Sequence, residues 1–231
     1  GSIAPGRRAD MILTPSLTEL QIERVYARGV LVAEKGRITV ACPHLDWPDH
    51  ARNTVHLGKT LEGADFEIAA PDGANTVTAK VIGVVENQAP TKALTADLHV
   101  SNGIVEPDEA NDIAQIALVE RHRGTGDVTN GFVSGFGYRG DMAIASTVAH
   151  DSHHMIVVGT DRDQMALAAN RLAEVGGGIT LFRDGGELAL VELPIAGLMS
   201  DDLASNVAAK TQKMVEAMID CGCKLNNAYM Q

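Results

Sequence analysis

A succession of short aliphatic runs, separated by segments that contain Gly, Asp or Asn, occupies much of the chain beyond residue 76. Such runs, with apolar residues alternating or continuous, are typical of β-strands, and the small polar residues between them favour turns. The clearest case is ITLFRDGGELALVELP, where Asp184-Gly185-Gly186 separates two apolar runs and predicts a hairpin. Further strands are expected over the ranges 77–85, 116–122, 142–150 and 155–160.

Two segments instead have the 3.6-residue periodicity of helices. Asp161 followed by Gln164 is a capping-box pattern, and the three glycines 176–178 are expected to end that helix. Ser200 is expected to cap the second helix, with Asp201 and Asp202 in its first turn and Gly222 at its end. The expected buried stripes are Met165, Ala168, Ala169, Leu172 and Val175, then Val207, Thr211, Met214, Val215, Met218 and Ile219.

The first 58 residues are organised differently. RVYARGVLVAEKGRI predicts a β-hairpin about Arg28-Gly29 with a second turn at Lys35-Gly36, and an apolar run over 9–13 precedes it. The Pro-bearing stretch 42–56 indicates a connector, which places a domain boundary near Gly58. Residues 59–231 are predicted to form an α+β domain, with short mixed strands and two main helices packed on one face.

The amino-acid composition of the chain limits the kinds of partner that it is expected to bind. The formal net charge of −11 and an aromatic content of 3% argue against a nucleic-acid surface, which needs clustered cations and exposed rings. No apolar run approaches the roughly 18 residues of a membrane span, and no signal-peptide pattern is present. The three cysteines, Cys42, Cys221 and Cys223, predict free thiols and a cytoplasmic location rather than a disulfide framework.

The most unusual stretch is TVAHDSHHMIVVGTD, which places His150, Asp151, Ser152, His153 and His154 between two apolar runs. Asp-Ser suits a turn, so the cluster is compatible with the polar tip of a hairpin. Neutral histidines can both donate and accept hydrogen bonds, which favours an acid–base or substrate-contact role. Metal ligation is a third hypothesis, although His-x-x-His alone supplies too few ligands for a zinc site.

Two other segments are candidate ligand contacts. ERHRGTGDVTNGFVSGFGYRG, residues 120–140, contains six glycines and predicts either a connecting loop or a loop over a ligand. Arg121, His122 or Arg123 would reach that ligand. LPIAGLMSDD, residues 193–202, predicts a strand-to-helix corner or a helix N-terminus that faces a polar ligand. No phosphate loop, nucleophile elbow or His-Glu-x-x-His helix is present.

Several segments resemble one known family, the bacterial adenine deaminases of the amidohydrolase superfamily. VERHRGTGDVTNGFVSGFG, ASTVAHDSHHMIVVGTD, MALAANRLAEVGGGI and LPIAGLMSD resemble successive blocks of the C-terminal domain of these enzymes, in the same order. IAPGRRADMIL is similar to the segment by which amidohydrolases leave the barrel and re-enter a small β-sandwich, to which VYARGVLVAEKGRI is also similar.

The resemblance implies an activity and its partners. Adenine deaminases are hydrolases of purine metabolism that convert adenine to hypoxanthine and ammonia. A divalent metal (Mn, Fe or Zn) activates the attacking water in a TIM-like barrel that has no counterpart in this chain. The chain is thus expected to be a non-barrel part of a cytoplasmic homo-oligomeric enzyme, inactive by itself, with residues 1–58 in a composite β-sandwich.

The same resemblance assigns site residues. His150, Asp151 and His153 are expected to be active-site contacts with catalytic roles, and Arg121, His122 and Ser152 to bind substrate; no metal ligand is expected in this chain. The Gly-rich segment would form part of a lid. Two alternatives remain open at this level: an accessory domain of another metal-dependent amidohydrolase, and a non-catalytic binding or oligomerisation module.

Overall fold

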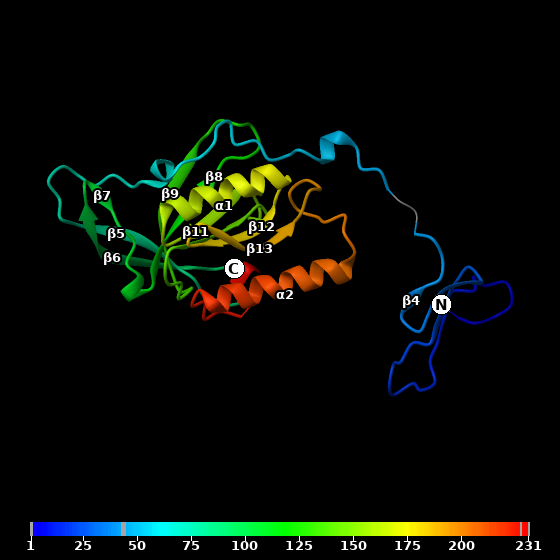
Figure 1. Ribbon diagram of the computed structural model, residues 1–231. Helices are drawn as coiled ribbons and strands as arrows, with labels where there is room; N and C mark the ends of the chain where they lie inside the picture. The colour runs from blue at the N-terminus through cyan, green and yellow to red at the C-terminus, as the bar shows by residue number, and fades with distance from the viewer. Residues whose placement is uncertain (1, 43–44, 227, 231) are drawn as a thin grey trace. The chain divides into compact units, whose positions relative to one another are not determined.

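Figure 1 shows a computed structural model, which describes residues 2–42, 45–226 and 228–230. The chain divides into two compact units, Gly1–Asp46 and Trp47–Gln231. The expected connector includes residues 43 and 44, which lie outside the described residues. Val55 and Leu57 are buried in the core of the second unit, so the contacts of the chain assign the segment from Trp47 onward to that unit. The boundary expected near Gly58 lies inside it.

The first unit is a four-stranded antiparallel sheet in the order β1-β2-β3-β4. Its strands are β1 (Met11–Leu13), β2 (Arg24–Ala27), β3 (Val30–Glu34) and β4 (Arg37–Ile38). The expected hairpin is confirmed: Arg28 and Gly29 adopt positive φ values of 52° and 79°, which a tight two-residue turn requires. Among the described residues of this unit none is buried.

The second unit contains a nine-stranded sheet in the order β13-β12-β10-β11-β8-β9-β5-β6-β7. The strands are β5 (Thr76–Gly83), β6 (Lys92–Ser101), β7 (Ile104–Val105), β8 (Ile113–Val119), β9 (Val128–Ser134), β10 (Met142–Ser146), β11 (Met155–Gly159), β12 (Gly178–Arg183) and β13 (Gly186–Glu192). All neighbours are antiparallel except β5 and β9. The predicted β12–β13 hairpin is confirmed, whereas β6 and β9 were not expected.

Two α-helices accompany this sheet. Helix α1 (Arg162–Val175) begins as predicted: the Asp161 carboxylate accepts a hydrogen bond of 2.9 Å from the Gln164 amide, and Gly176 ends the helix at φ 80°. Helix α2 (Ala204–Asp220) starts later than predicted. The Ser200 hydroxyl accepts from the Asp202 amide in a local turn, so Leu203 becomes the N-cap residue and no described side chain caps the helix. The prediction of Ser200 as the cap is therefore wrong.

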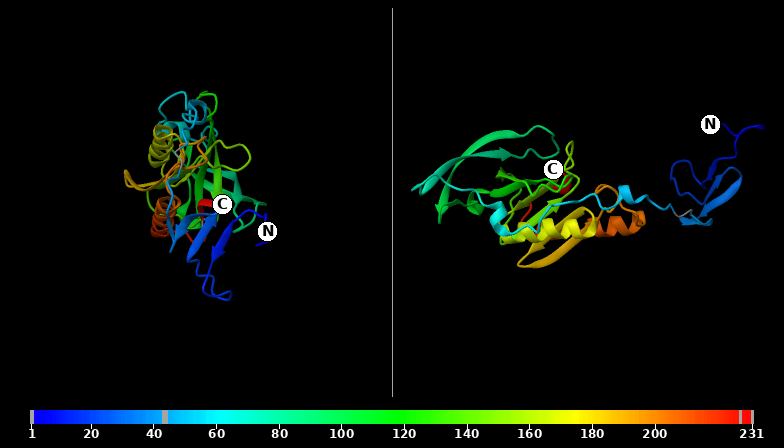
Figure 2. Two further views of the ribbon diagram at one scale, coloured as in Figure 1. Left: turned by 90° about the vertical axis from the view of Figure 1, so that its right-hand side faces the viewer. Right: turned by 90° about the horizontal axis from the view of Figure 1, so that it is seen from above.

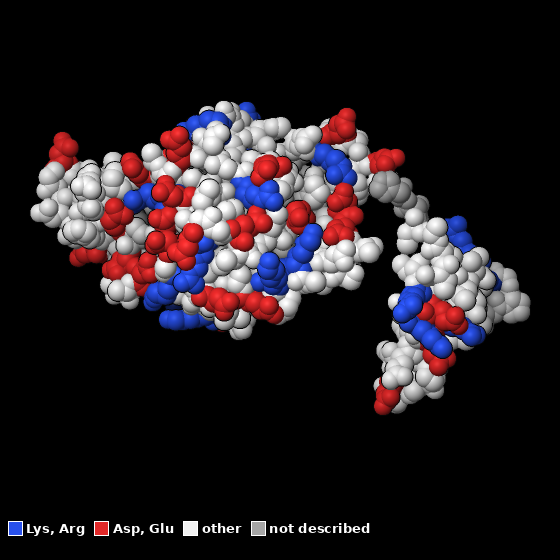
Figure 3. All heavy atoms as spheres, in the orientation of Figure 1, with Lys and Arg blue, Asp and Glu red and all other residues white. Residues whose placement is uncertain are grey.

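Short 3₁₀ helices complete the chain: η1 (Asp49–Ala51), η2 (Gly63–Phe66), η3 (Glu109–Asn111) and η4 (Ala228–Met230). Among the described residues, neither α-helix is long and apolar enough to cross a membrane. On the side drawn in Figure 3, acidic and basic side chains are interspersed over the second unit.

The two helices lie on opposite faces of the sheet, not on one face as predicted. Ala143 and Ala145 of β10 share a core cluster with α1, whereas Ile144 between them belongs to the cluster that contains α2 residues. Successive residues of a strand point to opposite faces, so the helices sandwich this end of the sheet. Figure 1 and the left view of Figure 2 show β12 and β13 between α1 and α2. Local periodicity cannot select a face, because the face depends on the whole strand order.

The two helices are also buried to different extents. In α1 the predicted stripe is confirmed from Met165 to Leu172, and only Val175 is half-exposed. In α2 only Met214 and Met218 of the predicted stripe are buried, together with Ala217. Ile219 is 58% exposed, because the helix turns its 214–218 strip toward β12 and β13. Val207, Thr211 and Val215 of the predicted stripe are half-exposed, and Ala204, Ala208 and Ala209 are exposed.

Candidate functional site

The histidine turn, residues 147–154, connects β10 to β11 in the second unit. Thr147 fixes its start: its hydroxyl oxygen accepts from the Gly178 amide at 2.8 Å and donates to the Gly197 carbonyl at 2.6 Å. Asp151 and His153 both adopt positive φ, at 73° and 51°, and the His153 amide donates to the Ala149 carbonyl. The predicted turn at Asp151-Ser152 is therefore present, and it reverses the chain between two antiparallel strands.

His150 and Asp151 form the tip of this turn. Their side chains are 95% and 93% exposed, and His150 Nδ1 lies 3.2 Å from Asp151 Oδ1. An ion pair in open solvent contributes little to stability. The tip is therefore free to contact a partner or a ligand, and nothing in the described residues fixes either side chain.

His153 and His154 lie closer to the base of the turn. His153 is half-buried, and its Nδ1 lies 3.3 Å from the Val148 carbonyl oxygen. The His154 ring packs against the His122 ring at a centroid distance of 4.9 Å. His122 Nε2 lies 3.1 Å from the Ser152 carbonyl oxygen, so the Gly-rich loop and the histidine turn are in contact. His154 Nδ1 is buried without a hydrogen-bond partner among the described atoms.

Arg121 joins these segments from the inside. Its side chain is 1% exposed, and its guanidinium donates to three backbone carbonyls: His153 at 2.6 Å, Thr54 at 3.1 Å and Ala196 at 3.2 Å. Burial lowers the pKa of Arg121, but a guanidinium stays protonated in proteins. The sequence suggested that Arg121 reaches a substrate; in the structure its donors are directed to backbone carbonyls instead. Its geometry is that of a residue that positions the histidine turn.

Glu120 organises the adjoining loop. Its carboxylate accepts hydrogen bonds from the amides of His122 at 2.6 Å, Arg123 at 2.9 Å and Thr125 at 3.2 Å. Burial alone would raise the pKa of Glu120, but these hydrogen bonds to the charged form lower it to about 2. Sequence reasoning missed this residue, although an acidic side chain directly before a Gly-rich loop was a visible signal.

A strand interrupts the Gly-rich segment. Residues 120–127 and 135–140 form loops, whereas Val128–Ser134 is strand β9, which pairs with β8 and β5 inside the sheet. A strand with neighbours on both sides cannot act as a mobile lid, so the lid expectation for the whole 120–140 segment is wrong. His122 and Arg123 remain exposed in the loop.

The segment 193–202 is a strand-to-helix corner. The Ala196 amide donates to Ala51 at 2.6 Å, and a bridge pairs Ile195 with Met199. Gly197 lies so close to Arg121 that a Cβ atom would approach its Nη1 to 2.9 Å. The corner thus serves the packing around Arg121, and a small residue is required at that point.

The described residues do not fit a divalent-metal site. No group of three or more His, Cys, Asp or Glu side chains among them is arranged to hold a metal ion. Cys221 and Cys223 are buried free thiols, and burial raises the pKa of both, which disfavours the reactive thiolate. What the turn offers is a set of hydrogen-bonding side chains, His150, Asp151 and Ser152, displayed from a fixed base.

Comparison with known proteins identifies the family to which the chain belongs. Residues 88–231 match the sequence family described as the adenine deaminase C-terminal domain. The whole chain is 75% identical over 231 residues to an adenine deaminase of Ruegeria sp. (strain TM1040), 65% identical to one of Paracoccus denitrificans, and 43% identical over 230 residues to one of Moorella thermoacetica. In each case the match covers 100% of this chain and 38% of the relative.

Proposed function

Because the chain belongs to the adenine deaminase C-terminal domain family, we propose that it is the non-barrel part of an enzyme that hydrolyses adenine to hypoxanthine and ammonia. The observation that carries this proposal is the 75% identity along all 231 residues to a protein named adenine deaminase. An accessory domain of another amidohydrolase, or a module without catalysis, is not favoured by these relatives.

The remainder of the enzyme is proposed to contain the metal-binding barrel. The chain spans 38% of the length of the curated relatives, so most of their polypeptide lies outside these residues. We propose that the divalent metal, Mn, Fe or Zn, is bound there. The further proposed partners are adenine and a second copy of the enzyme in a cytoplasmic homo-oligomer.

The exposed sheet of the first unit supports the proposal of a composite β-sandwich, in which other strands of the polypeptide cover this sheet. Its sheet buries none of its described residues, and Ile12, Val30 and Ile38 are 53%, 56% and 65% exposed. A small sheet needs a packed apolar face for stability, because its own strands bury too little surface. We propose that the sheet within residues 1–58 belongs to a sandwich completed by strands outside this chain. Residues 59–231, with the segment from Trp47 that packs against them, are proposed to form the C-terminal α+β domain.

The histidine turn is proposed to form part of the active-site wall. His150, Asp151 and His153 would contact the reacting region, and His122 and Ser152 would contact the purine. Imidazole, carboxylate and hydroxyl groups can match the donors and acceptors of a purine edge. A wall that closes the mouth of a barrel excludes water from competing reactions. Arg121 supports this wall from behind.

Substitution of His153 by Ala in the intact enzyme tests the proposal. The expected result is a kcat at least about tenfold lower with unchanged metal content, because a positioned hydrogen-bonding group near the reaction is lost. His99→Ala, which removes an exposed histidine from β6, is the matched control and should leave kcat unchanged. Unchanged kinetics in His153→Ala would reject the wall role, and an intact protein that releases no ammonia from adenine would reject the activity.

A further inference from the structure

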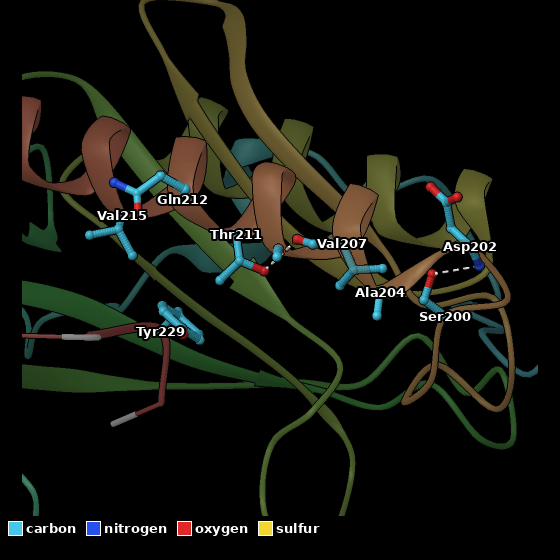
Figure 4. Close-up of a pocket in the computed structure, with 9 residues that line it drawn as sticks. Ser200, Asp202, Ala204, Val207, Thr211, Gln212, Val215 and Tyr229 are labelled. Carbon is cyan, nitrogen blue, oxygen red and sulfur yellow. Dashed lines mark hydrogen bonds between the residues drawn. The ribbon is translucent and has the colours of Figure 1, made fainter. Parts of the chain in front are cut away.

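Helix α2 has a second apolar side that the domain itself does not cover. A groove of about 580 Å³ runs along it and is lined mainly by small and aliphatic side chains. Figure 4 shows Ala204, Val207, Thr211 and Val215 directed to the side where Tyr229 of η4 lies. These positions recur every three or four residues, so they form a continuous stripe on one side of the helix.

Apart from Tyr229, the polar side chains of the groove are hydrogen-bonded within the domain. Ser200 Oγ accepts from the Asp202 amide at 3.2 Å, and Thr211 Oγ1 donates to the Val207 carbonyl at 2.9 Å, as the dashed lines in Figure 4 mark. The Gln212 amide donates to Glu216, and the Asp202 carboxylate accepts from Lys210 and Asn206. A small polar ligand would find few free partners here, so the groove presents apolar surface.

Apolar surface continues around it. Leu203 and Met199, which precede α2, are 70% and 50% exposed, and Ile219 near its end is 58% exposed. On the sheet face that α2 covers in part, Leu118 is 38% exposed beside its half-exposed cross-strand neighbour Ile156. Single exposed apolar residues are ordinary, but several of them before and near the end of a helix that carries an apolar groove indicate an interaction surface.

We propose that this groove is the docking surface for an apolar segment of the same polypeptide that lies outside residues 1–231. The relatives matched over all of this chain extend far beyond it, since the chain covers 38% of their length. A segment tethered in the same chain reaches the groove at high effective concentration and can fill it without strong individual contacts. Among the described lining residues, Ser200, Asp202, Thr211 and Gln212 make hydrogen bonds within the domain and the remainder apart from Tyr229 are Ala and Val, which fits an aliphatic occupant rather than a charged one. This inference rests on the proposal that the chain is part of a longer enzyme, and it does not depend on the role of the histidine turn.

Cysteine accessibility in the intact protein tests the occupancy. Ala208 is exposed and lines the groove, whereas its neighbour Ala209 is exposed but lies outside the lining. Ala208→Cys and Ala209→Cys are thus matched variants with the same small change. With a water-soluble maleimide, we expect Ala208→Cys to be labelled at least about tenfold more slowly than Ala209→Cys. Equal rates, quantified by peptide mass spectrometry, would overturn the proposal.

A crosslinking measurement identifies the occupant. The photocrosslinker p-benzoylphenylalanine replaces Gln212, which lines the groove, in a mixture of ¹⁴N- and ¹⁵N-labelled intact protein. The isotopes distinguish crosslinks within one chain from those between chains. Crosslinks in which both peptides carry the same isotope, and one of them lies outside residues 1–231, support the proposal. Mixed-isotope crosslinks would show a second copy in the groove, and crosslinks confined to residues 1–231 would show none of the rest of the polypeptide there; either result overturns it.

Discussion

The base and the tip of the histidine turn differ sharply although only a few residues separate them. At the base, the His153 carbonyl is bound by a guanidinium that is 1% exposed and that also binds Thr54 and Ala196. At the tip, the His150 and Asp151 side chains are almost fully exposed. The polar cluster of residues 150–154 therefore has two parts: a base that Arg121 holds, and a tip whose side chains are free in solvent. The tip side chains are open to a ligand and the half-buried His153 side chain is open in part, and the position of both is set by Arg121.

The largest effect is expected from Arg121→Met, which keeps an elongated side chain but removes the donors. The carbonyls of Thr54, His153 and Ala196 lose a buried donor, so the free energy of local opening of the turn should fall by about 3 kcal/mol. Native-state hydrogen exchange of residues 147–155 measures this fall. The exposed neighbour Arg123→Met is the control and should change the value by less than about 0.5 kcal/mol. Similar small changes in both variants would show that the base is not held by Arg121.

A smaller, pH-dependent effect is expected from Glu120→Gln. The folded-state pKa of Glu120 is about 2, below its ordinary value of 4.5, so its stabilisation is present above pH 4.5 and is lost as pH falls toward 2. After allowance for solvent screening, the unsubstituted loop should lose about 1 kcal/mol across this window, and the Gln variant should lose less. Hydrogen exchange of the 122–127 amides at several pH values tests this. Glu216 is exposed on α2, so the control Glu216→Gln should keep the pH profile of the unsubstituted protein. The same loss of stability with falling pH in Glu120→Gln would contradict the assignment of this loss to Glu120.

The smallest effect on stability is expected at the tip. His150→Ala should change the free energy of local opening by less than about 0.5 kcal/mol, because the side chain is 95% exposed. In the intact enzyme the same variant should lower kcat about threefold or more, through a lost active-site contact. A stability loss above about 1 kcal/mol would mean that the tip is structural, and an unchanged kcat would place it away from the reaction.

Local signals in the sequence predicted the elements that depend on a few neighbouring residues. The Asp161 cap, the Gly176 stop and the β12–β13 turn at Asp184-Gly185 are present as predicted, because each is decided within one turn of chain. The start of α2 was misjudged, since the Ser200 hydroxyl closes a local turn that competes with a helix cap. The face on which each helix packs depends on strand order across the sheet, which no short window contains.

The candidate site was predictable in its residues but not in their roles. Three histidines between apolar runs indicated a turn, and the turn is there. Arg121 looked like a ligand contact because it stands in a polar Gly-rich segment; its burial depends on carbonyls far away in sequence. The groove on α2 had a visible signal: Ala204 and Ala208 widen the predicted stripe beside Thr211 and Val215, and an apolar surface this wide exceeds what one packing face needs.

The three carbonyls bound by Arg121 also have a kinetic consequence. They lie 32, 67 and 75 residues from Arg121 along the chain, so each bond closes a long loop. The entropy of closing such loops must be overcome before the contacts stabilise anything, which makes them late events in folding. The histidine turn therefore acquires its final shape only when the strands and both flanking segments are assembled. A nascent or partly folded chain would display these side chains in the wrong geometry, so any ligand contact that they make would form only at the end of folding.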